Sequence, residues 1–393
     1  MRKYTNNKFM KAICITLMLA ISGPSAFALP PDPDNAALLY YQAFLLYEQP
    51  DESTRDLLKD VSEGKIEPSK KIIEYVEGCH TSLELAMVGS EIPMCHWGVR
   101  FSEGFAANLP FLAQARFLYR LVVADARILA GQGAYREALS RCLVAKRMGQ
   151  HMGDNVLISV FVAISIDKGA NNCIRDILGR MPADVETLQW LKTQVATVPT
   201  RALSINHALK LEQEVALQTM RVENIDMLVE TLTGAGIEVS DEMLKAVDKM
   251  SLEKCREHYS NHMSAMQNVL SAPMTYAKKY RELEKLDKRA KSEAKGNTDA
   301  AITAFLAPAS AKAYNLSSNA HAINNATRTA VDIYIIKAKT GKLPDGLPAD
   351  SPKDPFSGKD FEYEVTKNSF VLHCQAEDLE KNEIHQYEFK VSK

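Results

Sequence analysis

The stretch ARILAGQGAYREAL, residues 126–139, decides the fold of this chain. The residues before it carry apolar side chains at helical spacing, at Phe111, Ala115, Leu118, Val122, Ala126 and Leu129. Gly131-Gln132-Gly133 ends that helix, and a second helical pattern follows at Tyr135, Ala138, Cys142, Ala145 and Met148. A third helix is predicted from Asp154 onward. The sequence therefore predicts a core of consecutive helices joined by tight turns.

The same stretch resembles the tetratricopeptide pattern. In that family a small residue and a glycine let two helices approach, which implies that Tyr135 and Ala138 pack at the crossing. No second copy follows at the repeat length of that family, and a stable array needs about three units or more. A plain αα-hairpin is the alternative. We expect a mainly α protein whose body is an irregular helical bundle.

Length and composition describe an ordinary globular protein. The chain has 393 residues, of which 46% are hydrophobic and 24% are charged, with a net charge of −2. These values exclude a disordered chain, a collagen-like fibre and a polytopic membrane protein. The net charge shows no strong basic field, so we expect no nucleic-acid partner. The length indicates more than one domain.

The first 28 residues predict a cleavable signal peptide. They contain four basic and no acidic residues, followed by the apolar run 12–21 and by the small-x-small pattern of Ala26 and Ala28. The apolar run rises only about 15 Å as a helix, which is too short to span a membrane with ease. We expect cleavage after Ala28 and a periplasmic or secreted protein that does not span the membrane afterwards. An uncleaved N-terminal anchor is the alternative.

Cysteines allow disulfides in such a compartment. Six remain after cleavage, at Cys79, Cys95, Cys142, Cys173, Cys255 and Cys374. Cys142 and Cys173 lie in apolar, helical surroundings, where we expect buried thiols. The stretch 78–104 shows no clear period and is predicted to be a loop with a short turn. Cys79 and Cys95 flank that loop and are the disulfide candidate.

The C-terminal residues change character. An amphipathic helix is predicted over 320–339, and five turn-forming residues follow it, at Gly341, Pro344, Asp354, Pro355 and Gly358. Apolar side chains then alternate with polar ones in three short runs, at 361–365, 370–374 and 387–391. We therefore expect a helical domain over 29–315 and a small α+β domain over 316–393, with one helix and a three-stranded antiparallel sheet.

The turn sequences resemble the globular half of type II secretion major pseudopilins. In that family a Gly-x-Tyr-Pro turn leaves the helix and an Asp-Pro-Trp-Gly turn enters the sheet; here Leu343 replaces the tyrosine and Phe356 the tryptophan. Pseudopilins polymerise through a long apolar N-terminal helix that this chain lacks, so the resemblance does not imply a pilus subunit. Their calcium loop lies near the C-terminus, where this chain has Glu377, Asp378, Glu380 and Glu383. Without a glycine or repeated aspartates there, we expect a solvated acidic turn.

The chain as a whole resembles a group of uncharacterised exported helical proteins of planctomycetes and related bacteria. The shared segments are Asp-Asn-Ala-Ala-x-x-Tyr-Tyr at 34–41, Cys-His-Trp-Gly at 95–98, Leu-Pro at 109–110 and the C-terminal turns. This resemblance implies a fold and no established activity. Among the shared residues, His96 and Trp97 are candidates for an interaction site, with Trp97 as a core anchor being the alternative.

One helical stretch carries a candidate metal site. Cys255, His258 and His262 are spaced to share one helix face, and a zinc ion would need a fourth ligand from elsewhere. Plain polar residues on a helix face are the alternative.

Nucleophile elbows, phosphate-binding loops and dinucleotide-binding fingerprints are absent from the sequence. We therefore expect an exported, non-catalytic interaction or scaffold protein that uses no cofactor and binds a protein partner in the cell envelope through the helical body. Two alternatives stay open. One is a hydrolase with a site near residues 95–97, and the other is a metal-binding protein that uses Cys255, His258 and His262.

Overall fold

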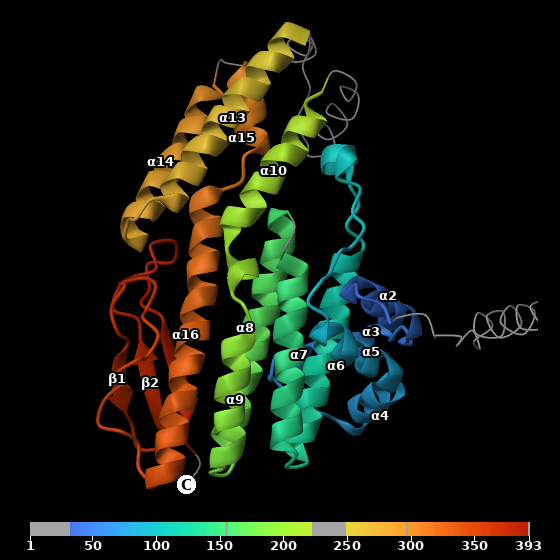
Figure 1. Cartoon of the computed structure of the whole chain (residues 1–393), viewed down its shortest axis with the longest axis vertical. Coiled ribbons are helices and arrows are strands. Elements are labelled where there is room, and N and C mark those ends of the chain that lie inside the picture. Colours follow the sequence, from blue (N-terminus) through green and yellow to red (C-terminus); the bar gives the residue numbers. More distant parts are fainter. Residues whose placement is uncertain (1–31, 154–155, 222–248, 296–297, 392–393) are drawn as a thin grey trace, which may run out of the picture. The chain divides into compact units, whose positions relative to one another are not determined.

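Helices make up most of the described chain in this computed structural model, and a small sheet lies near the C-terminus (Figure 1). The structure describes residues 32–153, 156–221, 249–295 and 298–391. The predicted signal peptide, with cleavage after Ala28, lies outside these residues. Residues Asn35–Lys393 belong to one compact unit. The expectation of a mainly α fold with a three-stranded antiparallel sheet is confirmed.

The elements follow one another in chain order. Those of the first half are α2 (Ala36–Leu46), α3 (Glu52–Ser62), α4 (Lys70–Gly78), α5 (His80–Glu91), the 3₁₀ helix η1 (Phe101–Ala106), α6 (Phe111–Gly131), α7 (Tyr135–Gly153) and α8 (Leu157–Arg180). Those of the second half are α9 (Val185–Thr197), the 3₁₀ helix η2 (Arg201–Leu203), α10 (Ile205–Thr219), α13 (Lys249–Ser271), α14 (Tyr276–Glu293), α15 (Thr298–Leu306), α16 (Ser310–Thr340), β1 (Glu362–Val365), β2 (Ser369–His373) and β3 (Gln386–Lys390).

The predicted helical hairpin is α6 and α7, and α8 packs beside both (Figure 1). Gly133 turns the chain between α6 and α7 with a φ of 82°, which residues with a Cβ rarely adopt. Ala115, Leu118 and Val122 on α6 are fully buried, as their spacing predicts. Each buried Leu or Val contributes about 1.5–3 kcal/mol relative to an exposed one, so this face holds the three helices together.

A buried ionic cluster joins α7, α8 and α16. The ammonium group of Lys146, only 1% exposed, donates to Asp167 Oδ1 at 2.6 Å, Asn171 Oδ1 at 3.1 Å and Asn324 Oδ1 at 2.7 Å. The amide groups of Asn171 and Asn324 donate to Asp167 Oδ2. All three ammonium protons are thus used, which compensates the cost of burying the charges.

The stretch 78–104 differs from the prediction of a loop with a short turn. Its first part is α5, a helix of 12 residues that packs on α2. Gly89 permits this packing, because a Cβ there would come within 3.3 Å of both Leu39 Cβ and Tyr40 Cε1. Gly89 therefore lies at a close contact between two helices. It does not end α5, which continues to Glu91.

The C-terminal sheet has the strand order β1-β2-β3, and both strand pairs are antiparallel. Phe370 of β2 pairs with Phe389 of β3, and their buried rings stack at a centroid distance of 5.2 Å. Strand β3 packs on α8 and α16. The sheet therefore rests on helices from both predicted domains, and the predicted boundary between residues 315 and 316 falls inside α16.

The five predicted turn residues lie between the end of α16 and β1. Gly341 caps α16 with a φ of 77°, and Gly358 has a φ of 74°. The buried carboxylate of Asp354 accepts backbone N–H groups of Phe356 and Gln375, each at 2.9 Å. Pro344 and Pro355 are partly buried in the same connection. Asp354 thereby ties this turn to the residues that follow β2.

Among the described helices, α8 alone is long and apolar enough to cross a membrane by length and composition. In the structure, 67% of its most apolar window is buried within the protein. It also carries Asp167 of the buried ionic cluster. Core helices of soluble proteins pass the same test of length and composition.

Candidate functional site

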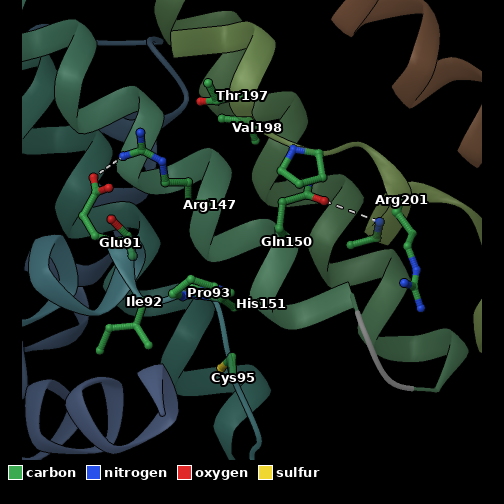
Figure 2. Close-up of a pocket in the computed structure, with 13 residues that line it drawn as sticks. Glu91, Ile92, Pro93, Cys95, Arg147, Gln150, His151, Thr197, Val198 and Arg201 are labelled. Carbon is green, nitrogen blue, oxygen red and sulfur yellow. Dashed lines mark hydrogen bonds and ion pairs between the residues drawn. The ribbon is translucent and has the colours of Figure 1, made fainter. Parts of the chain in front are cut away.

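A cavity of about 450 Å³ opens between α5, the loop after α5, α7, α9 and η2 (Figure 2). We name it the α5–α9 pocket. Its volume lies in the range of about 300–1,000 Å³ that is typical of ligand sites. It is lined by Ser90, Glu91, Ile92, Pro93, Cys95, Arg147, Gln150, His151, Thr197, Val198, Pro199, Arg201 and Ala202.

Two polar side chains of α7, Arg147 and Gln150, extend in different directions in Figure 2, Arg147 toward Glu91 and Gln150 toward η2. Arg147 forms an ion pair with Glu91 of α5 and donates to Gln194 Oε1 of α9 at 3.1 Å. Gln150 Oε1 accepts the backbone N–H of Ala202 at 3.4 Å. The Nε2 group of Gln150 is buried and has no hydrogen-bond acceptor among the described residues. An unpaired buried amide costs about 1–3 kcal/mol, and this donor lies just beneath the surface of the pocket.

The imidazole of His151 is neutral at ordinary pH. Burial lowers its pKa to about 4, and a hydrogen bond with the backbone of Ile92 opposes this shift only in part. Its Nδ1 lies 2.8 Å from the hydroxyl of Tyr40, and the backbone carbonyl of His151 accepts Trp97 Nε1–H at 2.9 Å. Because its ring already has partners in the protein, His151 is poorly placed to accept a proton from a substrate.

The thiol of Cys95 stays protonated. Burial raises its pKa to about 12, while a hydrogen bond from the backbone of Ala37 acts weakly in the other direction. The thiolate is the nucleophilic form of cysteine, and a reactive cysteine needs a lowered pKa. Cys95 therefore contributes a small, weakly polar surface to the pocket.

The predicted disulfide between Cys79 and Cys95 is not formed, and both thiols are free in the structure. Cys79 caps the C-terminal end of α4, where its thiol is near Tyr75 and the backbone of Glu48. Cys95 lies in the loop after α5, near the backbone of Ala37. Helix α5 separates the two cysteines where a loop was expected. Cys142 and Cys173 are both fully buried, as expected.

The two interaction candidates of the 95–98 segment lie outside the lining of the pocket. Trp97 is 5% exposed, and its ring stacks on Phe111 at a centroid distance of 4.4 Å. It therefore anchors the loop to the core. The side chain of His96 is exposed, and its backbone N–H and C=O are both bonded to the Asn35 amide. These bonds fix the loop against the start of α2.

The residues of the candidate zinc site lie on α13 and have other surroundings. Cys255 is fully buried. His258 Nδ1 lies 2.9 Å from Thr303 Oγ1, and His258 Nε2 lies 3.3 Å from Glu293 Oε2. Burial lowers the pKa of His262. In the described part of the chain, these three residues are not among the groups whose ligand atoms come together to hold a metal.

The acidic turn before β3 is less solvated than predicted, because Asp378 is fully buried. His385 Nε2 lies 2.7 Å from Asp378 Oδ2, and Asn315 of α16 donates to the same oxygen at 3.2 Å. Burial alone would raise the pKa of Asp378, but these hydrogen bonds hold it below its ordinary value. Asp378, Glu383 and His385 offer ligand atoms within 4.8 Å of one another. The hydrogen bond from Asn315 to Asp378 attaches the turn to α16.

Of the residues that line the pocket, the sequence analysis singled out Cys95 alone. It did not identify Arg147, Gln150 or Thr197 of α9 as site residues. No local motif marks these residues, because the pocket combines segments that are about 50 residues apart in the chain. Comparison with protein-family models, with curated proteins and with solved structures finds no match to this chain.

Proposed function

We propose that this chain is a non-catalytic interaction protein that binds an extended segment of a partner protein in the α5–α9 pocket. The observation that carries the proposal is the buried Nε2 group of Gln150, which has no acceptor among the described residues. A small rotation of the Gln150 side chain toward the cavity would let a backbone carbonyl of a bound segment satisfy this donor.

The rest of the lining suits a polypeptide. Ile92, Pro93, Val198 and Pro199 offer apolar contacts, and Arg147 and Glu91 offer both charges at one end. An extended segment presents apolar side chains and backbone polar groups in alternation. Fixed prolines in the walls also reduce the conformational entropy that binding removes.

The states of the polar residues argue against the hydrolase alternative. A hydrolytic site at Cys95 would need a thiolate and a base beside it. The raised pKa of Cys95 and the lowered pKa of His151 both result from burial, and they leave a neutral thiol and a neutral, hydrogen-bonded imidazole. The sequence pattern of residues 1–28 supports a partner in the cell envelope.

Site-specific photo-crosslinking in the native cell envelope tests the proposal. A photo-crosslinking amino acid at Thr197, which lines the pocket, is expected to give a defined adduct with one partner. The same amino acid at Thr193, one turn earlier on α9 and exposed, is the position control.

The adduct is expected to fall about tenfold in a Gln150→Met background, since a lost hydrogen bond of about 1.4 kcal/mol changes affinity by that factor. Gln114→Met, at an exposed position of α6, is the matched control and is expected to leave the adduct unchanged. Equal adducts at residues 193 and 197, or an adduct that is insensitive to Gln150→Met, would contradict the proposal.

A further inference from the structure

A second cavity, of about 420 Å³, lies between the C-terminal end of α3 with the residues that follow it, α6 and α8. We name it the α6–α8 pocket. It is lined by Ser62, Glu63, Lys65, Arg116, Tyr119, Arg120, Ser165, Ile166, Lys168, Gly169 and Asn172. Only Ile166 among these has a branched aliphatic side chain, so the lining of this pocket is somewhat more polar than that of the α5–α9 pocket.

Positive charge dominates the lining. Arg116 and Arg120 stand one turn apart on α6, and Lys168 faces the same cavity from α8. None of the three forms an ion pair with a carboxylate in the described part of the chain. The single carboxylate of the lining, Glu63, is already paired with Lys65 at 2.5 Å. Three cations thus line one cavity without a carboxylate partner among the described residues, Arg120 partly buried and Arg116 and Lys168 exposed, in a chain whose net charge is −2.

Neutral hydrogen-bond donors complete the lining. Asn172 lies one turn after Lys168 on α8, and Ser165 lies nearly one turn before it. The hydroxyl of Tyr119 lies against Gly169, where a Cβ would be only 1.6 Å from Tyr119 Oη. The absence of a side chain at residue 169 therefore makes the room that brings this hydroxyl to the wall of the pocket.

We propose that the α6–α8 pocket binds a soluble small molecule that carries a phosphate or sulfate group. Planar guanidinium groups, ammonium groups and amide or hydroxyl donors are the groups that recognise tetrahedral oxyanions. Arg147 of the α5–α9 pocket already has Glu91 and Gln194 as partners. Arg116, Arg120 and Lys168 have no carboxylate partner in the described part of the chain, so the α6–α8 pocket is the better anion site. The volume exceeds that of a single phosphate and leaves space for an attached organic group.

Isothermal titration calorimetry of the protein with glucose 6-phosphate and pyrophosphate as probes tests this site, with glucose as the uncharged control. We expect both anions to bind, glucose to show no heat, and affinity to fall as salt rises. Arg120→Gln is expected to weaken binding about tenfold or more, as the loss of a charge-assisted hydrogen bond does. Arg120→Lys is expected to recover part of that loss.

The matched control is Arg281→Gln on the exposed face of α14. It removes the same charge from a residue that does not line the α6–α8 pocket, and we expect it to leave the affinities unchanged. An equal loss in Arg281→Gln would show that only the overall charge matters and would overturn the site. No binding of either anion, with the variants folded by circular dichroism, would overturn it as well. Binding to phosphatidylglycerol vesicles without binding to the soluble probes would overturn the assignment of a soluble ligand and identify a lipid headgroup.

Discussion

His151 is a buried imidazole whose titration is moved out of its ordinary range. It takes up a proton near pH 6.5 in the unfolded chain and only near pH 4 in the folded one. Between these values the unfolded state binds more protons, so falling pH favours unfolding. Burial also lowers the pKa values of His262 and His321, which therefore act in the same direction.

We predict that lowering the pH from 7 to 5 reduces the free energy of unfolding by about 2 kcal/mol through the protonation of His151 in the unfolded state alone. Urea unfolding at a series of pH values measures this, and His151→Asn is expected to give a flatter dependence. His96→Asn, at an exposed histidine, is the control and is expected to keep the slope of the parent. An unchanged slope in His151→Asn would mean that folding does not lower the pKa of this imidazole.

At the scale of elements, Lys146 and Asp167 connect three helices, α7, α8 and α16, through one buried cluster. Removing one ion of such a pair leaves the other buried and uncompensated. Exposed pairs behave differently, because water screens them. The pair of Lys288 and Glu284 on α14 is of that kind, at 2.8 Å but with side chains 70% and 41% exposed.

We predict that Asp167→Leu lowers the free energy of unfolding by about 3–5 kcal/mol. The double variant Lys146→Met with Asp167→Leu is expected to lose less than the single variant, because no charge is left buried. Glu284→Gln is the exposed control and is expected to change stability by about 1 kcal/mol or less. Chemical denaturation of the parent and the three variants measures these values, and a double variant that loses as much stability as Asp167→Leu, or more, would contradict the coupling.

Helices and strands were predictable from the sequence wherever apolar residues recur at regular spacing and form one face that packs on the core. The spacing of Ala115, Leu118 and Val122 predicted α6, and the alternation around Phe370 and Leu372 predicted β2. Helix α5 was not predictable in this way, because Gly89 and its neighbours resemble loop residues and the glycine makes room for α2. The α5–α9 pocket was unpredictable because its walls meet only through tertiary packing.

At the scale of the whole molecule, α16 links the two predicted domains. It packs on α8, α9 and α14, and β3 packs on both α8 and α16. Asp378, in the turn before β3, is attached to Asn315 near the start of α16. Few contacts cross an ordinary domain boundary, whereas here one helix takes part in both regions.

We predict that a chain beginning at residue 29 unfolds in a single calorimetric transition, with equal calorimetric and van't Hoff enthalpies. A fragment of residues 316–393 is expected to lack a folded sheet, since it loses α8 and the first residues of α16. Two resolved transitions, or a dispersed amide spectrum from the fragment, would show that residues 316–393 fold independently.

The stacking of Trp97 has a practical consequence. The chain has two tryptophans. The ring of Trp97 stacks on Phe111, and its indole N–H donates a hydrogen bond to the backbone carbonyl of His151. His151 also lines the α5–α9 pocket. The other, Trp190, lies under the guanidinium of Arg136 at 5.1 Å. With Trp190→Phe as background, the emission of Trp97 becomes an intrinsic optical reporter of that pocket, so occupancy can be followed in unlabelled protein.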